Sequence, residues 1–563
     1  MAHQFRPVDR DSEMLLPHNM LDWVPEGHAV RVVIGTAEQV MTRDLMARLV
    51  PPAPKGSAAG PARYDPVMLV TVWMYAYLRG VLSTRAVEDR CRYDATFRVA
   101  CGRQVPDHST FARFRRHLFA QDGLAEDLFC QVLRVCACAG LGRLPVVAGD
   151  GDGIAANASK EASRTEAGLR KLAAQVMGAA REAAAADEAG RAALPGTDLL
   201  LGADVAAGPD PRSRAGRVLA CLADLRAARE AAEAAAREQG KAYLEAIAAG
   251  TVNGRPPAAV ALAAAQLRLE EATAAEEAAL AGWQARRAAG QRVARPPVRP
   301  GTGKKARKAR ARLDELQAAA AEAAGQEEQD PGGTGKQPRR NITDPDSRLL
   351  PVRGGGFTQG YNCQDAAADD QLMLGGYACQ DTGDVQQAQR LAQVAEKGAA
   401  VVAAGHAAHA ADPATLARCH SRLCTLPEAG RHSPGHDPAA CHAAMTSTIG
   451  VLVEDAGYHS EANLTAPGPD RLIADAKTRD VLGHDGTQPA AGTGPVAANP
   501  CRLRTPQGRA ICKRRAPDVE GLHASLKDNG GLRRFSLRGL HNATSEFLFA
   551  GLAHNLRLLT AIS

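Results

Sequence analysis

A long segment of unusual composition interrupts the chain and limits the folds that the remainder can adopt. Between residues 161 and 330 the only aromatic residues are Tyr243 and Trp283, while alanine, glutamate and arginine dominate. Such a composition favours helix by intrinsic propensity, but it offers only a thin apolar stripe, so we expect shallow packing. Strand-like segments lie on both sides of it. The core must therefore be built from segments that are far apart in the sequence.

The flanking segments predict a mixed α/β core. One apolar strand ends near Asp150, a hairpin after residue 346 turns near Asp369–Asp370, and a later strand ends at Asp455. Helices alternate with these strands, so the natural solution is a mixed central sheet flanked by helices. We expect a helical N-terminal domain, the first core strand, a helical insertion and the remainder of the core, at residues 1–140, 141–160, 161–340 and 341–563.

The N-terminal region has the outline of a helix-turn-helix. Residues 64–80 predict a buried helix, and a break near residue 103 precedes a helix that Asp107 or Ser109 can cap. This last helix carries Arg113, Arg115 and Arg116. A basic helix after a tight break is typical of proteins that read DNA. The alternative is a packing or dimerisation domain with a solvated basic face.

The basic run at residues 301–312 lies inside the helical insertion. It could contact nucleic acid, although a solvated helix face or a linker is the simpler interpretation. We expect that the insertion is not needed for the chemistry of the chain.

Charge and cysteine content add few constraints. The net charge of +6 is a mild basic excess, so its distribution matters more than its sum. No segment has the roughly 18 uninterrupted apolar residues that a membrane helix needs. The 13 scattered cysteines fit reduced thiols in the cytoplasm, and we expect no membrane partner. Cysteines and histidines between residues 419 and 442 follow no strong zinc spacing, so a polar loop is the default there.

Three acidic residues stand where a catalytic site can form. Asp150 and Asp455 follow apolar strands, and Glu520 lies on a late helix. Carboxylates gathered at one sheet edge can hold hard divalent cations, which promote in-line phosphoryl transfer. A single acid at a strand end is more often a solvated turn residue or a helix cap. Asp152 faces the same way as Asp150, because strand side chains alternate with period two, so periodicity leaves both open as ligands.

Five segments resemble the DDE-type transposases of bacterial insertion sequences, in the order expected for that family. They read "PDHSTFARFRR", "DGDGIAANAS", "NITDPDSRLLPVRGGGFTQGYNCQDAAADD", "VEDAGYHSEANL" and "RLRTPQGRAICKRRAPDVEGLHASLKDNGGLRRFSLRGL". The resemblance covers nearly all of the chain outside residues 160–340 and 406–445. It implies an all-α N-terminal domain ahead of an RNase H-like α/β catalytic core.

The resemblance also implies particular site residues. Asn157 lies seven residues after Asp150, as it does after the first aspartate of the family pattern, so Asp150 is the ligand and Asp152 takes the place of a threonine. The implied catalytic and metal-binding triad is Asp150, Asp455 and Glu520. The implied cofactor is Mg²⁺ or Mn²⁺, as a pair of ions. Besides the three arginines of the N-terminal helix, the residues expected to hold DNA are Arg515, Lys527, Arg533, Arg534 and Arg538.

The activity implied is DNA transposition by metal-dependent strand cleavage and attack of the freed 3′-hydroxyl on target DNA. The expected partners are double-stranded terminal inverted repeats and target DNA, bound by a homodimer or higher oligomer in the bacterial cytoplasm, at the nucleoid. The alternative is a catalytically decayed DNA-binding protein that recognises element ends without cleaving them, because Asp152 and Cys512 depart from the family pattern. A general RNase H-like nuclease fits less well, since it would leave the N-terminal domain without a role.

Overall fold

The described part of the chain forms two compact units. The core unit comprises Met1–Glu161 and Asp346–Ser563, and the helical unit comprises Ala162–Pro345. The computed structural model describes residues 19–50, 63–176, 178, 213–251, 254–329, 338–352, 355–410, 448–475 and 494–562. The predicted polar loop at 419–442 lies outside these residues. Within them, no helix combines the length and the apolar character needed to cross a membrane.

A mixed sheet lies at the centre of the core unit. The strand order is β4-β5-β1-β7-β8, and β6 pairs with β5 as well. β5 runs antiparallel to β1, whereas β7 runs parallel to β1 and β8 runs parallel to β7. The strands are β1 (Val146–Ala155), β4 (Arg348–Pro351), β5 (Phe357–Ala368), β6 (Met373–Cys379), β7 (Val451–Glu454) and β8 (Arg471–Ile473). The predicted hairpin is confirmed as β5 and β6.

Helices precede and follow the strands of the sheet. The N-terminal elements are η1 (Met20–Trp23), α1 (Ala29–Val40), α2 (Arg43–Leu49), α3 (Pro66–Leu78), α4 (Thr84–Tyr93), α5 (Ala95–Ala100), α6 (His108–Ala120) and α7 (Leu124–Cys138). The later ones are α12 (Ala388–Ala410), η3 (Ala456–Tyr458), α15 (Glu461–Thr465), α17 (Pro495–Arg504), α18 (Pro506–Ala524), the π-helical turn η4 (Ser525–Asn529) and α19 (Leu540–Ile562). Asp107 caps α6 as expected, because its carboxylate accepts from the backbone N–H groups of Ser109 and Thr110.

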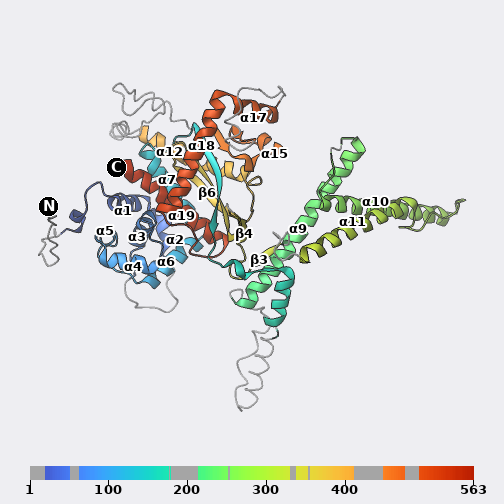
Figure 1. Ribbon diagram of the computed structural model, residues 1–563, viewed down its shortest axis with the longest axis horizontal. Helices are drawn as coiled ribbons and strands as arrows, with labels where there is room; N and C mark the ends of the chain where they lie inside the picture. Colours follow the sequence, from blue (N-terminus) through green and yellow to red (C-terminus); the bar gives the residue numbers. More distant parts are fainter. Residues whose placement is uncertain are drawn as a thin grey trace, which may run out of the picture. The chain divides into compact units, whose positions relative to one another are not determined.

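The N-terminal helices share a hydrophobic core with α19, which lies against α3 and α7 (Figure 1). Trp73 and Tyr77 of α3 are fully buried. The Tyr77 hydroxyl donates to the buried Glu546 carboxylate of α19 at 2.9 Å, and the Ser536 N–H donates to the same carboxylate at 2.8 Å. The segment expected to be a separate N-terminal domain therefore packs on the C-terminal helix within one unit.

The helical unit is an insertion that begins and ends with two short paired strands. β2 (Ser163–Thr165) pairs antiparallel with β3 (Arg339–Asn341), which brings both ends of the unit together. The described residues between them include three long helices: α9 (Arg214–Ala249), α10 (Ala258–Ala288) and α11 (Lys304–Gln329) (Figure 1). Packing is shallow, as the thin apolar stripe predicts. Where α9 meets α10, a Cβ on Gly240 would lie 3.1 Å from the Ala264 nitrogen, so glycine allows the close approach.

A buried histidine joins α19 to the π-helical turn. His554 is 2% exposed. Its Nδ1 lies 2.8 Å from the Ser525 hydroxyl, and its Nε2 lies 2.8 Å from the Gln371 carbonyl oxygen. A neutral imidazole satisfies both contacts, with Nε2 donating to the carbonyl and Nδ1 accepting from the hydroxyl. Burial lowers the pKa of His554 to about 4, because the charged form would lose its hydration.

This depressed pKa predicts acid sensitivity. The unfolded chain takes up the proton near pH 6.5, whereas the folded chain does so only near its pKa of about 4. The contribution of His554 to stability is therefore complete above pH 6.5 and is lost as the pH falls toward 4, by about 3 kcal/mol in the free energy of unfolding. Urea denaturation of the wild type and of His554→Gln, which cannot titrate, measures this directly. A difference between the two proteins that stays constant from pH 7.5 to 4.5 would contradict the prediction.

Candidate active site

The sheet register brings Asp150 and Asp455 to the same level. On β1 and β7, Ala148 is paired with Val453 in parallel register. Asp150 and Asp455 each lie two residues further along. They therefore lie beside each other just beyond the paired part of these strands, Asp150 in the middle of β1 and Asp455 directly after β7. The two aspartates that the sequence singled out from segments about 300 residues apart are thus brought together.

The two carboxylates interact strongly. Burial raises the pKa of Asp455, and the charge of Asp150 raises it further. Burial likewise raises the pKa of Asp150, against the opposing effect of the Arg515 guanidinium of α18. Arg515 Nη1 lies 2.9 Å from Asp150 Oδ2. The pair therefore presents partly buried negative charge that one protein cation offsets.

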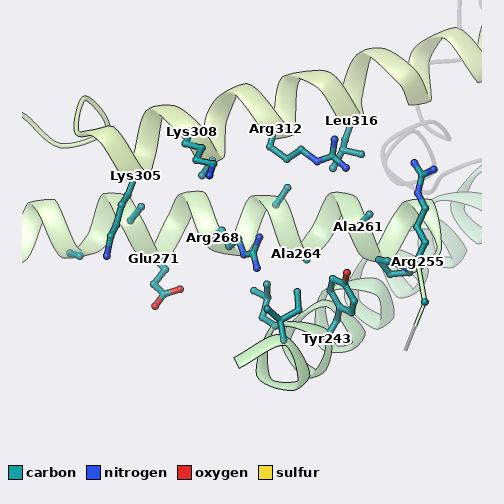
Figure 2. Close-up of a pocket in the computed structure, with 18 residues that line it drawn as sticks. Tyr243, Arg255, Ala261, Ala264, Arg268, Glu271, Lys305, Lys308, Arg312 and Leu316 are labelled. Atoms are coloured by element: carbon teal, nitrogen blue, oxygen red, sulfur yellow. The ribbon is translucent and has the colours of Figure 1, made fainter. Parts of the chain in front are cut away.

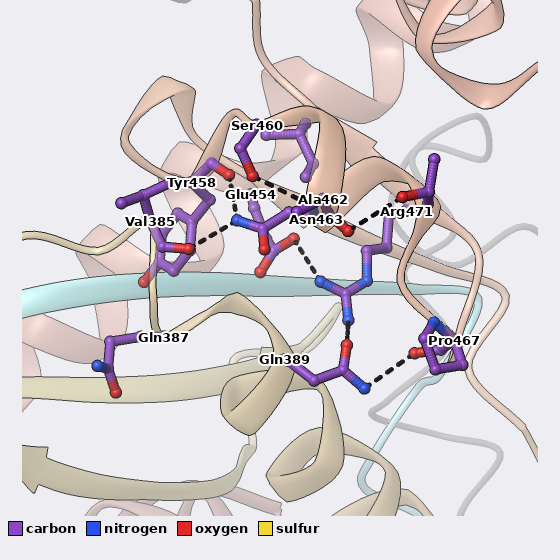
Figure 3. Close-up of polar contacts among 12 residues, drawn as sticks. Val385, Gln387, Gln389, Glu454, Tyr458, Ser460, Ala462, Asn463, Pro467 and Arg471 are labelled. Carbon is purple, nitrogen blue, oxygen red and sulfur yellow. Dashed lines mark hydrogen bonds and ion pairs between the residues drawn. The ribbon is translucent and has the colours of Figure 1, made fainter. Parts of the chain in front are cut away.

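A network of buried polar groups holds the end of β7, as Figure 3 shows. Glu454 and Arg471, on β7 and β8, are buried with an N–O separation of 3.9 Å, and burial raises the pKa of Glu454 to about 8. Arg471 donates to the Gln389 amide oxygen at 2.7 Å. After the strand, the Asn463 amide donates to the carbonyl oxygens of Tyr458 and Val385, each at 2.7 Å. Asp455 is therefore positioned by contacts on both sides of it in the sequence.

Helix α18 and η4 carry two more cations that contact strand carboxylates. Lys527 Nζ lies 2.6 Å from Asp152 Oδ1, and His523 Nε2 lies 2.9 Å from Asp365 Oδ2. Asp365 is opposite Asp150 in the β1–β5 pair. Burial lowers the pKa of His523. The charge and hydrogen bond of Asp365, together with the charges of Asp152 and Asp150, outweigh burial and raise the pKa to about 9. Asp150, Asp152 and Asp365 thus all point toward α18 and η4, as period-two alternation predicts for the first two.

Sequence reasoning missed Asp384, which lies beside the aspartate pair. The amides of Asn362 and Gln364, on the same face of β5, donate to Asp384 Oδ1 at 2.8 and 2.7 Å. The charge of Asp384 also contributes to the raised pKa of Asp455. The available signal was the alternation of Asn362 and Gln364 in "GYNCQ", which places two amides on one strand face.

Two family models match the chain at its two ends. A transposase domain, DUF772, matches residues 18–117, and a transposase DDE domain matches residues 493–560. Together, the two matches support a DDE-type transposase of an insertion sequence. Searches of curated proteins and of solved structures found no match. The second match includes Glu520, whereas Asp150 and Asp455 lie between the matched segments.

The acidic residues of this transposase differ in their surroundings. Asp150 and Asp455 lie together, but Glu520 is exposed on α18 and makes no hydrogen bond or ion pair with any described residue. Within the described ranges, no three His, Cys, Asp or Glu side chains are grouped closely enough to hold a metal ion by themselves. The aspartate pair still fits a hard divalent cation, because Mg²⁺ is commonly held by one or two carboxylates together with water and substrate phosphate.

The expected DNA-binding residues fall into three groups. Arg113 and Arg116 are exposed on α6, and Arg533, Arg534 and Arg538 are exposed after η4. Arg515 and Lys527 are paired with Asp150 and Asp152. The prediction for Arg115 does not hold: its side chain is buried, donates to the Leu82 carbonyl at 2.6 Å and lies 4.6 Å from the Trp73 ring centroid. Its place in the core of the N-terminal helices leaves it unable to reach a phosphate.

Glycine at position 151 is required by the crowding around Asp384. A Cβ there would lie 2.5 Å from Asp384 Oδ1 and would also clash with the Gln364 amide. We expect Gly151→Ala to destabilise the core unit by about 1–3 kcal/mol, since overpacking forces neighbouring groups to move. Gly153→Ala is the matched control, because its Cβ would meet only Leu350 at an ordinary 3.5 Å. Chemical denaturation compares the two, and equal stability of both variants would contradict this account.

Proposed function

We propose that this transposase cleaves DNA at the ends of an insertion sequence and joins the freed 3′ ends to target DNA. The observation that carries the proposal is the juxtaposition of Asp150, within β1, and Asp455, directly after β7, in a chain whose two ends match transposase domains. In the joining step, the 3′-hydroxyl oxygen forms a bond to a target phosphorus, and the bond from that phosphorus to the target 3′-oxygen breaks. The proton of the attacking hydroxyl is lost to solvent, and the leaving oxygen gains one.

The topology supports an RNase H-like core. Along one path the strand order is β6-β5-β1-β7-β8, with antiparallel pairs on one side of β1 and parallel pairs on the other. In sheets with parallel strands, ligands commonly bind beyond the carboxyl ends of the strands. β7 ends directly before Asp455, and Asp150 lies beside it within the longer strand β1, so a scissile phosphate would bind at the end of β7.

Asp150 and Asp455 would hold divalent cations, which supply Lewis-acid activation of the attacking oxygen and stabilise the leaving oxygen. Glu520 is proposed as a third ligand on the motif alone. Arg515 and Lys527 balance the negative charge of the carboxylates and orient them through their ion pairs. Exposed Arg113, Arg116 and the arginines after η4 would hold DNA phosphates, which fix orientation rather than read sequence. We propose that a homodimer or higher oligomer assembles on the two element ends.

The decisive experiment uses the purified full chain with Mg²⁺ or Mn²⁺ and labelled duplexes taken from the DNA that flanks its gene. Asp150→Ala and Asp455→Asn should lower the cleavage rate by at least about 10³-fold, because metal-assisted stabilisation amounts to several kcal/mol. The matched control is Glu461→Gln, which removes an exposed carboxylate shortly after Asp455 and should cleave normally. Tight end binding without cleavage under either metal would favour the catalytically decayed form, for which the exposed position of Glu520 is the supporting observation.

A second pair of variants tests the assignment between neighbouring aspartates. Asp152→Thr should retain much of the cleavage activity, because Asp152 pairs with Lys527 and lies in the place of a threonine in the family pattern. If Asp152→Thr abolished cleavage and Asp150→Ala preserved it, the register of the motif would be wrong. Cleavage rates measured at saturating metal separate a loss of catalytic activity from a weaker affinity for the metal.

A further inference from the structure

The helical unit contains an open groove lined by basic residues. α9, α10 and α11 enclose a volume of about 1030 Å³, which we call the insertion groove (Figure 2). Alanines and Leu244 and Leu316 form its apolar wall. Five cations and a single carboxylate, Glu271, line it. The cations are Arg255, Arg268, Lys305, Lys308 and Arg312.

Most of this positive charge has no partner among the described residues. Lys305, Lys308 and Arg312 follow one face of α11 at spacings of three and four residues, and Arg268 lies on the neighbouring helix α10 (Figure 2). Arg312 pairs with Glu315 at 2.6 Å. Among the described residues, Arg268, Lys305 and Lys308 make no hydrogen bond or ion pair. The groove therefore presents cations that remain available to an external anion.

The position of these charges in α11 opposes the stability of the helix. Its first nine residues, Lys304 to Arg312, contain six cations, and the first acid is Asp314. Helix N-termini carry partial positive charge, so the cations of the first turn, Lys304, Lys305 and Arg307, are unfavourable by a few tenths to about 1 kcal/mol each. A helix selected only for stability would carry acids at this end. Charges that are unfavourable for helix stability are expected where they are needed to bind a ligand.

We propose that the insertion groove binds the sugar–phosphate backbone of double-stranded DNA, at a contact separate from the aspartate site. This inference rests on the proposed function only in taking DNA as the substrate. Lysines and arginines on an open helix face suit phosphates, of which duplex DNA presents one charge about every 1.7 Å of axis. Tyr243 is the one aromatic residue lining the groove, and single-strand binding usually requires successive aromatic rings for base stacking. The duplex backbone is therefore the occupant that the groove fits.

The test measures binding of the full chain to a short fluorescein-labelled duplex of arbitrary sequence by fluorescence anisotropy, in EDTA and over a range of salt concentrations. The groove variant is Arg268→Gln/Lys305→Gln/Lys308→Gln. The matched control is Lys304→Gln/Arg307→Gln/Arg310→Gln, which removes the same charge from residues of α11 that do not line the groove. The slope of log K against log salt should fall by about 2.7 in the groove variant, at about 0.9 per lost phosphate contact, and by less than about 1 in the control.

Equal slopes for the two variants, or a wild-type slope in the groove variant, would overturn the proposal. A single strand that binds as tightly as the duplex and shows the same loss of slope would overturn the assignment to duplex DNA. Circular dichroism should be the same in all three proteins, since glutamine is well tolerated in helices. Neither variant should melt at a lower temperature than the wild type, because both remove cations near the N-terminus of α11. The binding assay contains no metal and measures no cleavage. Its result can therefore be interpreted even if the protein proves unable to cleave DNA. A chain that cleaves normally but binds DNA unchanged in the groove variant would refute the groove alone.

Discussion

Two carboxylates of like charge, Asp150 of β1 and Asp455 directly after β7, lie side by side, and the packing of α18 on the sheet depends on how that repulsion is offset. Burial raises the pKa of both aspartates, and the charge of Asp150 raises that of Asp455 further. Only an opposing charge makes such a pair tolerable near neutral pH. Arg515, at 2.9 Å from Asp150, supplies it and thereby ties α18 to the edge of the sheet. The same need for positive charge is what makes the site suited to a divalent cation.

Further ion pairs between cations of α18 and η4 and carboxylates of the strands hold these helical segments on the sheet. Arg515, His523 and Lys527 meet Asp150, Asp365 and Asp152, which come from two neighbouring strands. The π-helical turn includes Lys527, and Ser525 at its start bonds to the neutral His554 of α19. α19 in turn packs on the N-terminal helices through Tyr77 and Glu546. A continuous set of contacts therefore links the N-terminal helices to the aspartate pair within one unit.

The insertion groove differs from the aspartate site in how its charges are paired. In the core unit Arg515, His523 and Lys527 each meet a strand carboxylate. In the groove, Arg268, Lys305 and Lys308 meet none among the described residues. Charges that are paired in the protein set the geometry of a site, and charges that are unpaired are available to a polyanion. The helical unit thus contributes binding surface where the core unit contributes positioned acids.

The sequence by itself determined the elements and the two aspartates. Strand alternation, apolar runs and caps such as Asp107 depend on neighbours within a few residues, so β1, β5, β6, β7 and the helices could be predicted. Motif register chose Asp150 over Asp152. Asp365 and Asp384 escaped prediction because their proximity to the pair depends on strand pairing between distant segments.

Tertiary structure alone decided which charged side chains are paired, buried or exposed. Arg115 and Arg116 are adjacent on one helix, yet one is buried against Trp73 and the other is exposed. Glu520 is exposed although Arg515, on the same helix, pairs with Asp150. Local sequence cannot distinguish such residues, because burial and ion pairing depend on which distant element packs against each helix face.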